Sequence, residues 1–204
     1  MTDSASTGAA RKRRHEDVLV ITIDHPPVNA LSAAVRGDLS AAIRDAQADP
    51  QVRAILLVGA GRNFIAGADI REFGKPPQPP FLPDVCNQIE ASAKPVIAVL
   101  HGAALGGGLE VALAAHYRIA LAGAKLGLPE VNLGLLPGAG GTQRAPRLIG
   151  AQAALDLMLS GKPLSAEEAL QAGLVNALPG DSDPLAAGLA YTRRLLAAGA
   201  GPQR

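Results

Sequence analysis

The stretch His101-Gly-Ala-Ala-Leu-Gly-Gly-Gly-Leu-Glu110 marks a turn from a strand into a helix near the middle of the chain. It joins an apolar, β-rich run, residues 95–100, to a predicted helix at about 109–115. Three successive glycines leave bare N–H groups at a helix N-terminus, a position that favours a negative oxygen, although close packing of the helix on the strand explains them equally well. The spacing excludes a G-x-G-x-x-G dinucleotide fingerprint, and no Gly-Lys-Ser/Thr follows to make a phosphate-binding P-loop.

Apolar runs and amphipathic stretches alternate on both sides of this stretch, and their order predicts a single, mostly parallel, layered α/β domain over residues 17–204. The predicted strands are 18–23, 54–58, 95–100, 117–121, 125–128 and 174–178. The predicted helices are 32–48, a segment ending at Glu90, 109–115, 150–159, 165–173 and 184–197, and residues 129–141 are expected to form a glycine-rich connection.

Two segments carry no predicted element. Residues 1–16 are rich in small and polar side chains and include the basic run Arg11-Lys-Arg-Arg14, so we expect a disordered tail. Residues 74–83 contain five prolines, too many for a regular element. A mobile surface loop or lid is expected there.

The composition limits the classes of function. The net charge of +1 provides no overall field for nucleic acid, so the basic run is interpreted as solvated. The single cysteine, Cys86, allows no internal disulfide and is interpreted as a buried small hydrophobe. No stretch of about 18 apolar residues predicts a membrane span, and with no hydrophobic signal core we expect a cytoplasmic protein. The four histidines have no metal-ligand spacing, so no metal site is predicted.

Two glutamates stand beside turns marked by glycine or proline. Glu110 is expected in the first turn of the helix after the glycines, where it serves the helix dipole or faces a site. Glu130 follows Pro129 between apolar neighbours, a setting that buries a carboxyl and raises its pKa. Either residue alone is explained as well by a structural role. Together they can supply one general acid and one general base.

Three further features each have a functional and a structural interpretation. The segment Ala66-Gly-Ala-Asp-Ile70 either brings a backbone N–H to a substrate oxygen or is a turn in which Asp69 caps a short helix, and Arg71 meets a phosphate or is a surface charge. His101 is expected to be packed or hydrogen-bonded. The run Gly138-Ala-Gly-Gly141 fits an anion cradle and, equally, a wide turn ahead of a helix.

Four ordered motifs resemble the enoyl-CoA hydratase/isomerase (crotonase) family. They are His25-Pro-Pro-Val-Asn-Ala-Leu31, Phe64-Ile-Ala-Gly-Ala-Asp-Ile70, the stretch 101–110, and Leu128-Pro-Glu130 through Pro137-Gly-Ala-Gly-Gly-Thr-Gln143. The resemblance covers about Val18 to Pro179 and implies a right-handed spiral of ββα turns with two roughly perpendicular sheets. Residues 71–80 are most similar to the hydratase part of multifunctional fatty-acid oxidation enzymes.

The resemblance also implies roles for individual residues. Ala68 and Gly107 supply the two N–H donors of an oxyanion hole. Glu110 activates water at the β-carbon and Glu130 delivers the α-proton, unless the pair shares or reverses these roles. Contacts to the substrate or its CoA are implied for Pro27, Val28, Ala30, Ala66, Asp69, Ile70, Arg71, Gly106, Pro129, Leu133 and Gly138, the last of these through a backbone that helps to hold the attacking water.

With both glutamates present, the resemblance favours hydration of a 2-enoyl-CoA to a 3-hydroxyacyl-CoA in fatty-acid β-oxidation. The acyl-CoA thioester is the expected partner, and since CoA is part of the substrate, no separate cofactor is expected. The alternatives are an enoyl-CoA isomerase or other crotonase reaction, and a catalytically silent CoA-binding remnant.

The chain departs from the family pattern at its C-terminus. Stand-alone members continue with a helical segment that builds the trimer and closes over the CoA and acyl chain, whereas only residues 180–204 follow Pro179. We therefore expect a shortened C-terminal helical segment whose apolar residues, within 184–197, are exposed. Self-association, most simply as a trimer, is the expected outcome unless that helix folds back over its own core.

Overall fold

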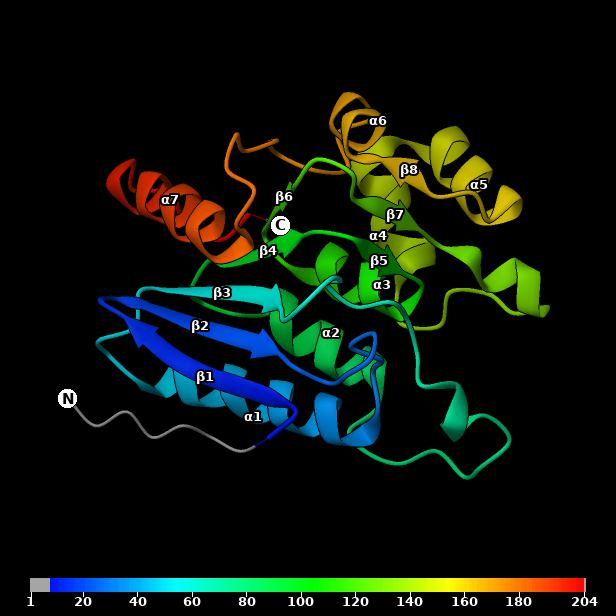
Figure 1. Cartoon of the computed structure of the whole chain (residues 1–204), viewed down its shortest axis with the longest axis horizontal. Helices are drawn as coiled ribbons and strands as arrows, with labels where there is room; N and C mark the ends of the chain where they lie inside the picture. The colour runs from blue at the N-terminus through cyan, green and yellow to red at the C-terminus, as the bar shows by residue number, and fades with distance from the viewer. Residues whose placement is uncertain (1–7, 204) are drawn as a thin grey trace.

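The computed structural model of the chain describes residues 8–203, which form one α/β domain built on two sheets (Figure 1). The large sheet has the strand order β1-β2-β3-β4-β6, and the small sheet has the order β5-β7-β8. The strands are β1 (Ala10–His15), β2 (Val18–Ile23), β3 (Ala54–Gly59), β4 (Val96–Leu100), β5 (Ala103–Leu105), β6 (Tyr117–Ala120), β7 (Lys125–Gly127) and β8 (Leu164–Ser165).

The helices lie between and around these strands. They are α1 (Ala33–Ala48), α2 (Leu82–Glu90), α3 (Gly107–Ala114), α4 (Gly141–Ile149), α5 (Ala151–Ser160), α6 (Ala166–Gln171) and α7 (Pro184–Ala197), with short 3-10 helices η1 (Ile70–Glu72) and η2 (Pro129–Leu133). Ser32 caps α1, and Ser165 with Glu168 forms the capping box of α6, as the sequence predicts.

Strands β2, β3, β4 and β6 are parallel, and every residue of β3 and β4 is buried. Helices therefore cover both faces, which is why these strands are continuous apolar runs. Alternate residues divide between two cores. Leu57 belongs to the core shared with α1 and α2, whereas Leu56 belongs to the core under α7.

The expectation of a disordered tail over residues 1–16 is wrong for 10–15. This segment is strand β1, antiparallel to β2 along its whole length. Its Arg11 and Lys12 are paired with the carboxylates of Asp24 and Asp45, so these two cations of the basic run are used within the fold. Native sheets often carry charged residues on an edge strand. The sequence did not reveal this strand, because the residues that pair with β1 are distant from it in the chain. Residues 1–7 of the expected tail lie outside the described residues.

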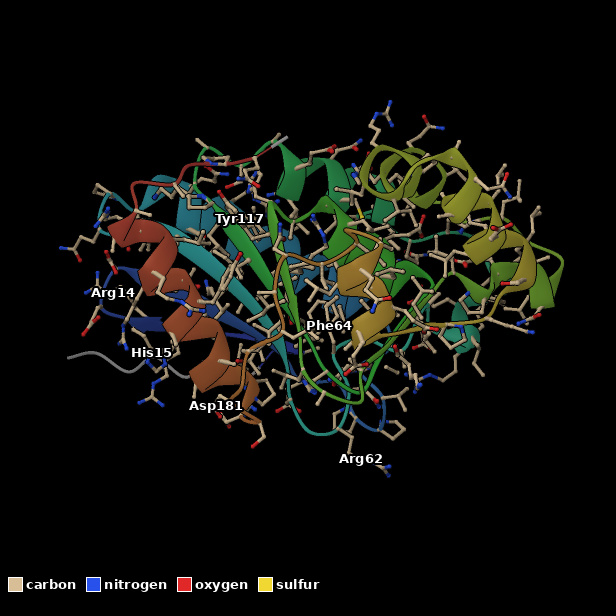
Figure 2. The ribbon with its side chains drawn as sticks, turned by 90° about the horizontal axis from the view of Figure 1, so that it is seen from above. Arg14, His15, Arg62, Phe64, Tyr117 and Asp181 are labelled. Atoms are coloured by element: carbon tan, nitrogen blue, oxygen red, sulfur yellow. The ribbon has the colours of Figure 1, made fainter. Side chains whose placement is uncertain are left out.

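The expectation of an exposed apolar stripe on residues 184–197 is also wrong. Helix α7 lies across the large sheet on the face opposite α1 and packs on β3 and β4 (Figures 1 and 2). Gly188 allows this close approach, since a Cβ there would meet the side chains of Val99 and Leu56 at 2.7 and 2.8 Å. Tyr191 of α7 meets Tyr117, labelled in Figure 2, edge-on at 6.4 Å. The helix folds back over its own core.

Three other differences concern element bounds. Helix α4 was not predicted, because Pro146 lies inside it and glycines precede it. Residues 174–178 form no strand; only Ala177 makes a single bridge, to Ile119 of β6. Helix α3 begins at Gly107, two residues before the expected start. This last shift brings the glycines themselves into the first turn of the helix.

Candidate active site

The two predicted oxyanion donors stand at matching positions on two neighbouring segments. Ile65 and Ala104 form a parallel bridge, in which the Ile65 N–H donates to the Ala103 carbonyl at 3.2 Å and the Leu105 N–H donates to the Ile65 carbonyl at 3.1 Å. Ala68 and Gly107 each follow their bridge residue by three positions. Because the two segments run parallel, both N–H groups lie at the same end of the paired segments.

Both of these N–H groups are available to a ligand. Within residues 8–203, neither the Ala68 nor the Gly107 N–H donates a hydrogen bond, and Gly107 opens α3, where N–H groups lack helical partners. Both residues line one cavity of about 180 Å³. A Cβ at Gly107 would lie 2.8 Å from the end of the Leu82 side chain, so a larger residue there would displace that side chain. Two backbone N–H groups without a protein partner therefore belong to residues that line one cavity.

Glu130 lies in η2 and lines the same cavity. Its Oε2 is buried and is the single buried side-chain oxygen or nitrogen within residues 8–203 that has no hydrogen-bond partner. Burial, and to a lesser extent the nearby charge of Glu110, raise the pKa of Glu130 above its ordinary value, as expected from its apolar neighbours. An unpaired buried carboxyl with a raised pKa is suited to exchanging a proton with a bound molecule.

The backbone at Gly106 makes room for this carboxyl. Gly106 has φ 52° and ψ −127°, a conformation that other residues rarely adopt, and a Cβ there would lie 3.1 Å from Glu130 Oε1. The backbone turn into α3 therefore favours glycine, and a side chain at this position would also press on the carboxyl of Glu130.

Glu110 lies in the first turn of α3, as expected, and is only 2% exposed. Its Oε1 accepts hydrogen bonds from the N–H groups of Ala139 at 2.7 Å and Gly141 at 2.8 Å. Burial raises the pKa of Glu110, and these two donors oppose the rise without cancelling it. One oxygen is thus fixed by backbone donors, while Oε2 accepts no hydrogen bond from the described residues.

A residue outside the sequence motifs holds this arrangement in place. Arg144 of α4 donates through Nη1 to the Ala139 carbonyl at 2.9 Å and through Nη2 to Glu90 Oε2 at 2.8 Å. It orients the turn whose N–H groups bind Glu110. Because α4 itself was not predicted, the sequence offered no signal for Arg144. The nearby Gly138 is exposed and makes no hydrogen bond with Glu110.

The two segments assigned to CoA lie side by side. The Ala66 N–H donates to the Val28 carbonyl at 3.2 Å, and the Leu31 N–H donates to the Gly67 carbonyl at 2.9 Å. Asn29, which the sequence did not single out, is buried at φ 58° and donates through Nδ2 to the Asn63 carbonyl at 2.8 Å. The turn and the loop thus form one continuous rim.

Asp69 caps η1, in agreement with the structural interpretation of its segment. Its side chain accepts from the Arg71 N–H at 3.0 Å and pairs with the Arg71 guanidinium at 2.7 Å. This pairing lowers the pKa of Asp69 to about 2. The Arg71 side chain remains largely exposed, with Nη2 at 3.3 Å from Nε2 of His25. Asp69 shapes the loop, and Arg71 can still meet an anion at the rim.

The structure brings most of the predicted site residues together. Those that line the 180 Å³ cavity are Ala66, Ala68, Ile70, Gly106, Gly107, Pro129, Glu130 and Leu133. The other predicted residues do not line it. Glu110 lies next to it, and Gly138 lies in the turn before α4. The rim segments hold Pro27, Val28, Ala30, Asp69 and Arg71.

Two other expectations concern residues outside the cavity. His101 is buried with Nε2 at 3.1 Å from the Gly59 carbonyl, and burial lowers its pKa, so the packed, hydrogen-bonded interpretation is confirmed. Cys86 is buried in α2 and burial raises its pKa to about 12, so a buried hydrophobe is confirmed. Within residues 8–203, no three His, Cys, Asp or Glu side chains gather as metal ligands would, and no helix is long and apolar enough to cross a membrane.

The raised pKa of Glu130 predicts how stability depends on pH. The folded chain binds the Glu130 proton more tightly than the unfolded chain does. The protonated carboxyl therefore stabilises the fold fully below the unfolded pKa, and this stabilisation is lost as pH rises through the folded pKa. At neutral pH Glu130→Gln should therefore raise the free energy of unfolding, because the amide carries no charge to be buried. Urea unfolding at pH 7 and pH 4 measures it. A gain that does not shrink toward pH 4 contradicts the interpretation.

The comparisons with known proteins agree with this geometry. The model of the enoyl-CoA hydratase/isomerase family matches residues 13–199. A peroxisomal bifunctional enzyme of Danio rerio is 54% identical over 159 residues, covering 78% of this chain and 22% of the relative. A probable enoyl-CoA hydratase of Bacillus subtilis is 50% identical over 166 residues, covering 78% of this chain and 64% of the relative.

The fold agrees as well. A crystal structure of an enoyl-CoA hydratase from Bacillus anthracis has a TM-score of 0.83 at 33% identity, covering 93% of this chain and 76% of that one. The chain thus spans less than two thirds of the length of the two curated relatives. The matching family model, the close relatives and the shared fold show that this chain belongs to the enoyl-CoA hydratase/isomerase family, with the crotonase fold.

Proposed function

We propose that this chain is an enoyl-CoA hydratase, which adds water across the 2,3 double bond of a 2-enoyl-CoA thioester to give a 3-hydroxyacyl-CoA in fatty-acid β-oxidation. One observation carries the proposal. An unpaired, buried carboxyl oxygen of Glu130 lies in the cavity that contains two free backbone N–H groups, with Glu110 close enough for its charge to raise the pKa of Glu130.

The two N–H groups suit the charge that develops in this reaction. As water adds to the double bond, the thioester oxygen becomes enolate-like, and the Ala68 and Gly107 donors stabilise it. Donors fixed by β5, its parallel neighbour and the start of α3 need little reorganisation. Losing one such donor typically lowers the rate by about 100- to 1000-fold.

The surroundings of the two carboxyls suggest separate roles. Glu110, held through Oε1 by two backbone donors, can use its other oxygen to orient and deprotonate water for attack at the β-carbon. Glu130, on the cavity wall beside Gly106, supplies the proton at the α-carbon. Because the charge of Glu110 raises the pKa of Glu130, the two carboxyls titrate with apparent pKa values that belong to the pair.

The CoA portion is proposed to lie against the rim formed by Pro27, Val28 and Ala30 with the 66–71 loop, where Arg71 can meet a phosphate. CoA is then part of the substrate, so no separate cofactor and no metal are proposed. Neither nucleic acid nor a membrane is a proposed partner. A cytoplasmic location remains a prediction, and several relatives are named as peroxisomal enzymes.

Product analysis separates this function from its alternatives. The purified chain is incubated with 2-enoyl-CoA and, separately, with 3-enoyl-CoA, and the products are identified by chromatography and mass spectrometry. Hydration predicts 3-hydroxyacyl-CoA from the 2-enoyl substrate. Double-bond migration alone would make the chain an isomerase, and tight binding of both thioesters without turnover would make it a silent remnant.

Self-association is a further part of the proposal, on a different surface from the one expected. Since α7 is packed on the sheet, the surface proposed for self-association lies instead at the cavity, where the exposed side chains of Leu133 and Leu135 line the same space as those of Ile70 and Phe73. Such a patch favours a partner. Light scattering at micromolar concentration should give a homo-oligomer, most simply a trimer. A well-behaved monomer would contradict this part of the proposal.

A further inference from the structure

A second, larger cavity adjoins the catalytic cavity. It measures about 510 Å³ and shares Ala68 and Phe73 with the 180 Å³ cavity. Phe81, Leu82 and several prolines of residues 76–83 give it mainly apolar walls. An acyl chain whose thioester oxygen meets the Ala68 N–H can therefore continue into this space.

One wall of this cavity is a segment without regular secondary structure. Residues 74–81 form no helix or strand and contain four prolines, which lack N–H donors. Lys75, Pro76, Pro77 and Gln78 line the cavity from this side. The position of the wall must consequently be set by contacts with the rest of the domain.

One side chain, Arg36, supplies two hydrogen bonds to this segment. Arg36 of α1 donates through Nε to the Pro80 carbonyl at 2.8 Å and through Nη2 to the Gln78 carbonyl at 2.9 Å. Its Nη1 donates to the Leu31 carbonyl at 2.8 Å and to Glu72 Oε2 at 2.9 Å. The planar guanidinium thus joins helix, wall and the end of η1 in one fixed geometry.

Glu72 completes the attachment from the loop side. Its Oε1 accepts from the Ala33 N–H at 2.6 Å, at the N-terminus of α1, where a carboxylate is favoured. Arg36 itself is 8% exposed and lines the cavity. Removing it would leave the carbonyls of Gln78 and Pro80 without this partner and would free the wall.

We propose that Arg36, together with Glu72, is a positioning residue that fixes the wall of the second cavity and thereby limits the length of acyl chain that the enzyme accepts. This inference rests on the proposed hydratase function. Arg36 touches no reacting atom; it acts through residues 74–81. With the wall fastened, the end of the cavity is fixed, so an acyl chain that is longer than the cavity must displace the wall, whereas a shorter chain fits without displacement.

The test compares Arg36→Met with Arg44→Met, a matched control. Arg44 lies on the same helix but is exposed and bonds through Nη1 to Ser40 Oγ. In Arg36→Met, kcat/KM for 2-decenoyl-CoA divided by kcat/KM for 2-butenoyl-CoA should rise at least about tenfold, mainly through a lower KM for the longer substrate. A single methylene in an apolar pocket typically changes the kcat/KM ratio of two substrates by about 10- to 200-fold. The control should keep the wild-type ratio. An unchanged ratio in Arg36→Met overturns the inference.

Two further readouts keep this result separate from the proposed function. The dissociation constants of butanoyl-CoA and decanoyl-CoA, measured by calorimetry, need no turnover and should shift in the same direction. Chymotrypsin should cleave Arg36→Met faster at Phe73, just before the wall, or at Phe81, its last residue, since both are exposed. Wild-type cleavage and binding ratios in a folded Arg36→Met chain overturn the inference. If that variant does not fold, Glu72→Ala is tested with the same expectations.

Discussion

Replacing Glu130 with Gln should lower the rate of α-proton exchange by about 100- to 10,000-fold, the range that a positioned acid or base contributes. The substitution removes the titrating carboxyl and keeps its shape beside Gly106 and the two N–H donors. Binding of CoA thioesters should stay close to wild type, because the rim and the cavity walls do not change.

Exchange is measured by mass spectrometry of 3-hydroxyacyl-CoA incubated in D₂O, and binding by calorimetry. Glu167→Gln, an exposed glutamate of α6, is the matched control and should exchange at the wild-type rate. Near-normal exchange in Glu130→Gln would show that another group handles the α-proton.

Replacing Glu110 with Gln should lower hydration by a similar factor, about 100- to 10,000-fold, while lowering α-proton exchange much less. A glutamine oxygen can still accept from the Ala139 and Gly141 N–H groups, so the turn before α4 should keep its structure. What is lost is the base that activates water.

The two rates are compared in one preparation, with hydration followed by chromatography of the 3-hydroxyacyl product and exchange followed in D₂O. Equal losses of both rates would mean that the two carboxyls act as one unit and that the assignment of separate roles is wrong. Near-normal hydration would remove Glu110 from the mechanism altogether.

Features with local causes could be predicted from the sequence. The caps at Ser32 and Ser165 depend on neighbouring residues, and so does the turn at Asp69. The site residues lie in short motifs in which glycine is required by backbone geometry, as at Gly106. Both glutamates and both oxyanion segments belong to such motifs, and their roles were predicted from the four motifs together, through the family resemblance.

Features that depend on distant contacts could not be predicted in this way. Strand β1 is held by pairing with β2 and by carboxylates such as Asp45, and nothing in the basic run itself indicates these partners. The proline-rich wall suggested a free loop, because Arg36 lies about forty residues before it in the sequence. The packing of α7 depends on a sheet face that the helix sequence does not reveal.

The addition of water is tested most directly by a single incubation of 2-butenoyl-CoA with the purified chain in ¹⁸O-labelled water, followed by mass spectrometry of the thioesters. The two-glutamate site predicts 3-hydroxybutanoyl-CoA that carries the label at C3, formed by the wild-type chain and by Glu167→Gln but not measurably by a chain with both Glu110→Gln and Glu130→Gln. Recovery of the substrate unchanged, or its conversion only to the 3-enoyl isomer, would contradict the proposed hydratase function.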